Sequence, residues 1–200
     1  MGELASLLPF PIHVYGVLLA LAFAGGIGVA LHLCERSGIS RDQIIDLAIV
    51  FMFSAIAGSR ILYIILYPQQ FRDVWSLFAL NRGGLVFYGG FVATALAVVA
   101  FGRRQGISLR LLGDVIAPSL AMGHTIGRLG CFANGCCYGA PSGLPWACRF
   151  PAAGDALARH PTQLYEALFL FAALLVTFRL ASRAPGAGRP RAGFIWGGYI

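Results

Sequence analysis

Long apolar segments alternate with short polar connections along this 200-residue chain. A membrane-spanning helix needs about 20 mostly apolar residues. Five segments approach that length, over residues 12–33, 44–67, 85–101, 111–126 and 161–178. A sixth begins at residue 193 and is still incomplete at Ile200, so we expect further residues beyond that position. The pattern predicts an all-α, polytopic membrane helical bundle, with residues 1–200 forming a single domain.

Composition supports lipid as the solvent of these helices. Hydrophobic residues make up 58% of the chain, charged residues 12%, and the mean hydropathy is +0.75. Soluble domains carry about 25% charged residues, roughly twice this share. The 26 glycines fit the same interpretation, because glycine is commoner in membrane helices than in soluble ones.

The arginines predict the orientation of the chain. All fifteen basic residues are arginine, and nine of them follow the first, third and fifth apolar segments. Short cytoplasmic loops collect arginine, so we expect this side to be inside and the N-terminus outside. The connection over residues 128–160 then forms a short outward-facing head segment. Because the charge is spread over short loops and not gathered in one groove, we expect no nucleic-acid partner.

Two arginines stand apart from these topology signals. Arg60 lies within the second apolar segment, where a charge is expensive, so it is expected to face the bundle interior. Arg128 ends the fourth segment and opens a turn rich in glycine and asparagine over residues 127–139. A guanidinium grips phosphate with two parallel hydrogen bonds, and lipid headgroups are the phosphates available at a membrane surface. The alternative for Arg128 is a side chain that snorkels to the interface.

Two further segments carry polar residues beside apolar spans. Residues 81–90 contain two glycine pairs, which indicate close helix packing or a broken helix end. Residues 160–166 begin the fifth span, where Thr162 and Gln163 could cap the helix. Glu166 enters the apolar region and needs a partner there, for which Arg128 and Arg60 are the candidates.

Four of the five cysteines fall within the predicted head segment, at Cys131, Cys136, Cys137 and Cys148. Disulfides are permitted on the outward-facing side of the membrane. The spacing lacks the paired C-x-x-C typical of zinc sites, so we expect a disulfide before a metal, with buried free thiols as a further alternative. Cys34 lies on the expected reducing side and is predicted to be inert.

The order of these segments resembles the bacterial prolipoprotein diacylglyceryl transferase family. The resemblance runs from Val14-Tyr15-Gly16 to Gly198-Tyr199 and is carried by several motifs. They are G-S-R at 58–60, G-G-x-x-F-x-G-G at 83–90, D-x-I-A-P at 114–118, G-R-L-G-x-F-x-N-G at 127–135 and H-P-T-Q-L-Y-E at 160–166.

The resemblance implies a transferase of the bacterial cytoplasmic membrane, with its active site at the outer face. Its substrates are phosphatidylglycerol and the lipobox cysteine of a prolipoprotein, its product is a thioether, and no cofactor or metal is expected. The implied catalytic residues are Arg128, Tyr88, Asn134, His160 and Glu166. The implied substrate-binding residues are Arg128, Arg60, Gly89, Gly90, Gln163, Tyr165 and Tyr199.

Three positions depart from the family pattern. Tyr88 stands where the family usually has histidine, Cys131 replaces an asparagine, and Cys136 replaces a glutamate. These changes motivate an alternative hypothesis, a phospholipid-binding relative without catalysis. The cysteine cluster motivates another, a redox or metal-handling membrane protein.

Overall fold

The structure is a computed structural model that describes residues 14–71, 77 and 83–182. It divides into two compact units, residues 38–112 and the remainder of the chain. The predicted sixth span at 193–200, and Tyr199 within it, lie outside the described residues. The described part is helical apart from a short hairpin, which confirms the expected all-α class.

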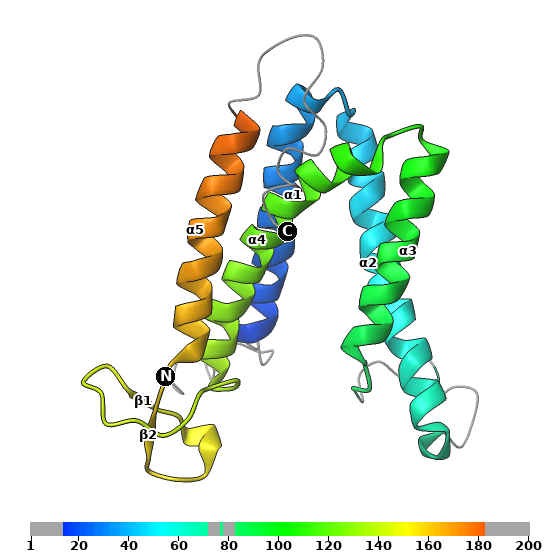
Figure 1. Cartoon of the computed structure of the whole chain (residues 1–200). Coiled ribbons are helices and arrows are strands. Elements are labelled where there is room, and N and C mark those ends of the chain that lie inside the picture. The colour runs from blue at the N-terminus through cyan, green and yellow to red at the C-terminus, as the bar shows by residue number, and fades with distance from the viewer. Residues whose placement is uncertain (1–13, 72–76, 78–82, 183–200) are drawn as a thin grey trace, which may run out of the picture. The chain divides into compact units, whose positions relative to one another are not determined.

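The first unit contains α1 (Val14–Ser37), most of α4 (Leu109–Asn134) and α5 (Thr162–Ser182), which lie side by side in Figure 1. Small residues bring α1 and α4 together. A Cβ on Gly26 would lie 3.1 Å from the Ser119 carbonyl oxygen, and one on Gly123 would lie 3.3 Å from that of Ala22. Such close backbone approach is typical of helix pairs in membranes.

The head of this unit is a hairpin between α4 and α5. Strand β1 (Cys148–Arg149) pairs antiparallel with β2 (Ala158–Arg159), and the 3-10 turn η5 (Pro151–Ala153) follows β1. Phe150 is buried between the rings of Phe132 and Tyr138, whose centroids lie 5.9 and 5.2 Å away. This aromatic cluster packs the hairpin onto the end of α4.

The second unit contains α2 (Arg41–Leu66), the turn η2 (Pro68–Gln70) and α3 (Phe87–Arg104). Ser40 begins α2 through a capping box with Gln43, which satisfies backbone donors at both positions. A Cβ on Gly58 would collide with Ala93, and one on Gly89 would collide with the Gly58 carbonyl. The two helices therefore meet through glycines.

Three of the described helices are long and apolar enough to cross a membrane, over Val14–Glu35, Arg41–Leu66 and Thr162–Leu180. Large apolar side chains on them are exposed, including Phe53 on α2 and Leu168 and Phe169 on α5. Water would penalise such surfaces, whereas lipid tails solvate them. The structure therefore has the surface of a membrane protein, as the composition predicted.

Candidate active site

An ion pair joins the two long helices that flank the head segment. Nη2 of Arg128, on α4, lies 2.5 Å from a carboxylate oxygen of Glu166, on α5. This pairing confirms one of the two partners expected for Glu166. Nε of the same guanidinium is buried and has no hydrogen-bond partner among the described residues. Glu166 thus holds the Arg128 guanidinium at Nη2.

The end of α4 is built by a Schellman motif. Gly135 adopts a left-handed conformation at φ 71°, its N–H donates to the Phe132 carbonyl, and the N–H of Cys136 donates to that of Cys131. This 6→1 and 5→2 pattern is the usual way for a helix to end at glycine. It places the side chains of Cys131 and Cys136 next to each other, one turn beyond Arg128.

The first turn of α5 holds the loop that follows α4. Gln163 is fully buried, and its side-chain N–H donates to the Cys136 carbonyl at 2.5 Å. The Thr162 hydroxyl donates to the Cys137 carbonyl at 2.8 Å. The two side chains therefore bond to the preceding loop, and the expectation that they cap α5 is wrong. Oε1 of Gln163 is buried and has no hydrogen-bond partner among the described residues.

Tyr165, on α5, contacts two residues of the head segment, Trp146 and His160. The Trp146 indole N–H donates to the Tyr165 hydroxyl at 2.8 Å, and that hydroxyl lies 3.2 Å from Nδ1 of His160. The three side chains form a chain of polar contacts that reaches from the hairpin to α5. It fixes the imidazole ring, which is a group able to move protons near neutral pH.

An ion pair stabilises the hairpin itself. Asp155 accepts a hydrogen bond from Nη2 of Arg159 at 2.5 Å and another from the Leu157 N–H at 3.1 Å. These bonds, that of Arg159 first, lower the pKa of the Asp155 carboxyl from its ordinary value. The Arg159 guanidinium also lies 5.1 Å from the Tyr138 ring centroid. This arginine therefore has a structural role in the head segment.

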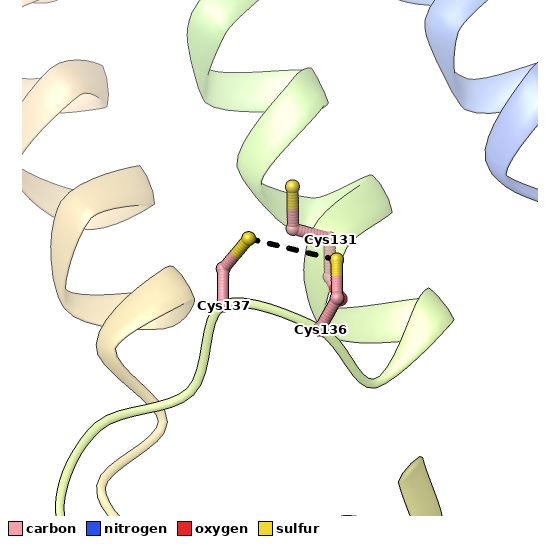
Figure 2. Close-up of side chains that lie close together, drawn as sticks. All are labelled: Cys131, Cys136 and Cys137. Carbon is pink, nitrogen blue, oxygen red and sulfur yellow. Dashed lines mark hydrogen bonds between the residues drawn. The ribbon is translucent and has the colours of Figure 1, made fainter. Parts of the chain in front are cut away.

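Three thiols converge at the end of α4 (Figure 2). The sulfur atoms of Cys131, Cys136 and Cys137 all lie within 4.8 Å of one another. They are free thiols, as is Cys148, so the structure does not contain the disulfide expected from the sequence. Burial raises the pKa of Cys136, but hydrogen bonds from Asn134, Cys137 and Cys131 outweigh it and lower this pKa overall.

Arg60 belongs to the other unit, where it is almost fully buried at 8% exposure. Its Nε donates to the Leu77 carbonyl at 2.8 Å, and its Nη1 donates to the carbonyls of Gly83 and Gly84 at 2.8 and 3.1 Å. The expected inward orientation of Arg60 is confirmed. These bonds also attach the segment before α3 to α2.

Tyr88, Gly89 and Gly90 lie on the first turn of α3. Tyr88 is exposed, with its ring against Phe87 at 5.8 Å between centroids. A Cβ on Gly90 would collide with the Ser59 hydroxyl and lie 2.8 Å from the Ala55 carbonyl oxygen. The glycine pair therefore packs α3 against α2, and its expected part in substrate binding stays a prediction.

The structure thus gathers six of the predicted site residues in one unit, at the facing ends of α4 and α5: Arg128, Asn134, His160, Gln163, Tyr165 and Glu166. Arg60, Tyr88, Gly89 and Gly90 belong to the other unit. Trp146 was missed, although an indole in an outward head segment is a common interfacial donor. The bonds of Thr162 and Gln163 to the loop were missed because nothing local in the sequence specifies them.

The long apolar helices and the large apolar side chains exposed on them define an integral membrane protein. The chain matches prolipoprotein diacylglyceryl transferase over residues 3–200, and it belongs to this family.

Curated relatives carry the same name. The chain is 36% identical to the phosphatidylglycerol–prolipoprotein diacylglyceryl transferase of Methylococcus capsulatus, over 88% of this chain and 68% of the relative. It is 34% identical to that of Bordetella avium, over 94% and 74% of the two chains. The relative from Pseudoalteromonas translucida is 34% identical, over 96% and 73%.

Proposed function

We propose that this chain transfers the diacylglyceryl group of phosphatidylglycerol to the lipobox cysteine thiol of a prolipoprotein. Membership of the family and the shared name of its relatives support this activity. The reaction forms a carbon–sulfur bond at the glyceryl carbon that carries the phosphate. The carbon–oxygen bond breaks, its electron pair stays on the phosphate oxygen, and glycerol phosphate leaves. The thiol proton is released to a base.

The observation that carries the proposal is the state of Arg128. Glu166 fixes one nitrogen of the guanidinium, while Nε is buried without a partner among the described residues. A donor already desolvated and oriented loses little on binding an anion. The Arg128 side chain as a whole retains 26% exposure. We therefore assign Arg128 to the headgroup phosphate and to the charge that develops on the leaving group.

The neighbouring residues supply complementary groups. Gln163 stays a predicted substrate-binding residue, and its buried side chain holds the loop after α4 through the Cys136 carbonyl. His160, oriented through Nδ1 by Tyr165, is assigned as the group that takes the thiol proton. Asn134 hydrogen-bonds Cys136 and is assigned to positioning the loop after α4. Tyr88 and Tyr199 stay predicted site residues, for catalysis and substrate binding respectively.

The proposed location is the bacterial cytoplasmic membrane, with the N-terminus and the head segment outside. The arginine distribution supports this orientation. Cysteine labelling with a membrane-impermeant reagent in intact spheroplasts tests it. Cys137 and Cys148 should react from outside, whereas reaction only after lysis would reverse the orientation.

The activity is tested with purified protein in phosphatidylglycerol vesicles and a synthetic lipobox peptide. The proposal expects a peptide mass increase equal to one diacylglyceryl group, together with release of glycerol phosphate. A peptide with serine in place of the acceptor cysteine is the control and should remain unmodified. Stable binding of phosphatidylglycerol without any modified peptide would reject the transferase and favour a lipid-binding relative.

A further inference from the structure

We propose that Cys131, Cys136 and Cys137 form a three-thiolate binding site for one thiophilic d10 metal ion, Zn²⁺ or Cu⁺. Their sulfur atoms lie within 4.8 Å of one another, and those of Cys136 and Cys137 are 3.6 Å apart. Figure 2 shows the three sulfurs at the corners of a triangle at the end of α4. Soft thiolate ligands select these two ions from the common biological metals.

The sulfur spacing suits metal coordination. With a metal–sulfur bond of ~2.3 Å, ligands at tetrahedral angles lie ~3.8 Å apart and those in a trigonal plane ~4.0 Å apart. The Cys136–Cys137 sulfur distance of 3.6 Å is already close to these values, and the other sulfur pairs, which lie within 4.8 Å, need to approach by at most about 1 Å. Three thiolates complete a trigonal Cu⁺ site, whereas Zn²⁺ keeps a fourth position for water or another ligand.

The backbone holds the thiols in this arrangement. The Schellman motif brings Cys131 and Cys136 together across the end of the helix, through the Cys136 N–H bond to the Cys131 carbonyl at 3.1 Å. Cys137 has a φ of 63°, a left-handed conformation that costs about 1 kcal/mol or more for a residue with a Cβ. This turn directs the third thiol toward the other two.

Contacts from α5 stabilise the strained turn. Gln163 and Thr162 donate to the carbonyls of Cys136 and Cys137, so both cysteines are fixed at their backbones by a second helix. Strained backbone that surrounding contacts hold in place is common at functional sites. A preorganised set of ligands of this kind lowers the ordering cost of metal binding.

A disulfide within the cluster is the competing fate of these thiols. Adjacent Cα atoms lie ~3.8 Å apart, whereas disulfides usually need ~4.4–6.8 Å, so pairing of Cys136 with Cys137 is disfavoured. Pairing of Cys131 with Cys136 is the oxidised form that the test must exclude. It would leave Cys137 alone and remove the site.

Metal binding would also alter the surroundings of Arg128. Zn²⁺ bound by three thiolates carries a net charge of minus one, and Cu⁺ a charge of minus two. The cluster begins one turn of α4 after Arg128. An anion at that distance would attract the positively charged guanidinium.

The test uses the purified full chain in detergent, under anaerobic conditions with a phosphine reductant. Zn²⁺ and Cu⁺ are titrated separately against chromophoric chelators, and Co²⁺ reports thiolate ligation through its charge-transfer absorption. We expect one ion per chain. Serine at any of the three positions should weaken binding by more than about 100-fold, because loss of outer-shell partners alone costs ~10–100-fold. The preferred ion is the one that the parent protein binds with the higher affinity.

Cys148→Ser is the matched control, because this thiol lies in the same head segment and donates to the Trp146 carbonyl instead. Its affinity should stay within about twofold of the parent protein, and melting curves should show that every variant is folded. The proposal is overturned by equal binding in the triple serine variant, by absence of binding, or by a Cys131–Cys136 disulfide in anaerobically prepared protein. The assay contains no lipid or peptide, so its result is independent of the transferase activity.

Discussion

Glu166 on α5 holds Nη2 of Arg128 on α4 at 2.5 Å, while Nε of the same guanidinium stays buried without a partner among the described residues. The pair orients the arginine before any ligand binds. Orientation in advance is the main way in which a protein strengthens an anion site, because the donors need no rearrangement during the reaction. The proposed phosphate binding therefore depends above all on Arg128.

Removal of the Glu166 carboxylate should impair transfer by releasing Arg128. A hydrogen bond to a charged group contributes ~1.5–3 kcal/mol, so Glu166→Ala should lower kcat/KM by ~10–100-fold. Glu166→Gln keeps an acceptor oxygen, so its kcat/KM should lie between those of the parent protein and Glu166→Ala. Asp155→Asn breaks a different arginine–carboxylate pair, in the hairpin, and should change transfer by less than about threefold. Equal effects of the alanine variant and this control would contradict the orienting role.

The chain of contacts from Trp146 to His160 should behave as one unit. Trp146→Phe removes the indole donor, and Tyr165→Phe removes the hydroxyl that joins the indole to the imidazole. Each should lower the transfer rate, by roughly 5–10-fold for a neutral hydrogen bond of ~1–1.5 kcal/mol. The double variant should be no worse than Tyr165→Phe alone, since directly coupled groups are not additive. Additive losses would show that the two residues act separately.

Gly90 should be intolerant of any side chain. A Cβ there collides with the Ser59 hydroxyl and approaches the Ala55 carbonyl, so Gly90→Ala must separate α2 from α3. Overpacking of this kind costs about 1–3 kcal/mol, and the melting temperature in detergent should fall by several degrees. Gly28→Ala on α1 is the matched control, because a Cβ there meets nothing within 4 Å. Equal melting temperatures of the two variants would refute tight packing at Gly90.

The Asp155 carboxyl should titrate below its ordinary pKa of ~3.9, because the bonds from Arg159 and the Leu157 N–H favour its charged form. Its contribution to hairpin stability is then present above that value and is lost as the pH falls through the lower pKa of the folded state. A carboxyl-labelled NMR titration measures the midpoint. In Arg159→Gln the midpoint should rise toward ~3.9. An unchanged midpoint would show that the ion pair does not form in solution.

The sequence predicted the helices well because their signal is local. Long apolar runs report lipid exposure directly, and a glutamate inside one of them requires a partner, which proved to be Arg128. The burial of Arg60 followed from the same reasoning. Each of these inferences needs only the cost of a charge in an apolar medium.

The remaining features depend on contacts between segments distant in the chain. The bonds of Gln163 to Cys136 and of Thr162 to Cys137 join residues more than twenty positions apart, and no periodicity encodes them. Part of the thiol cluster, the pair of Cys131 and Cys136, could have been predicted from the sequence. A glycine after Asn134 predicts a Schellman end, and that geometry would have paired Cys131 with Cys136. The left-handed turn at Cys137 carries no such signal, because cysteine has no preference for it.

The most direct test of the account is the rate of diacylglyceryl transfer to a lipobox peptide by Arg128 variants. Loss of a preorganised donor at a developing charge costs ~100–1000-fold, so Arg128→Ala should fall by at least ~100-fold. Arg128→Lys keeps the charge but loses the planar fork, and it should remain at least ~10-fold impaired. Arg149→Lys, in the β1 strand, should match the parent protein. Undiminished transfer by Arg128→Ala in folded protein would contradict the central claim.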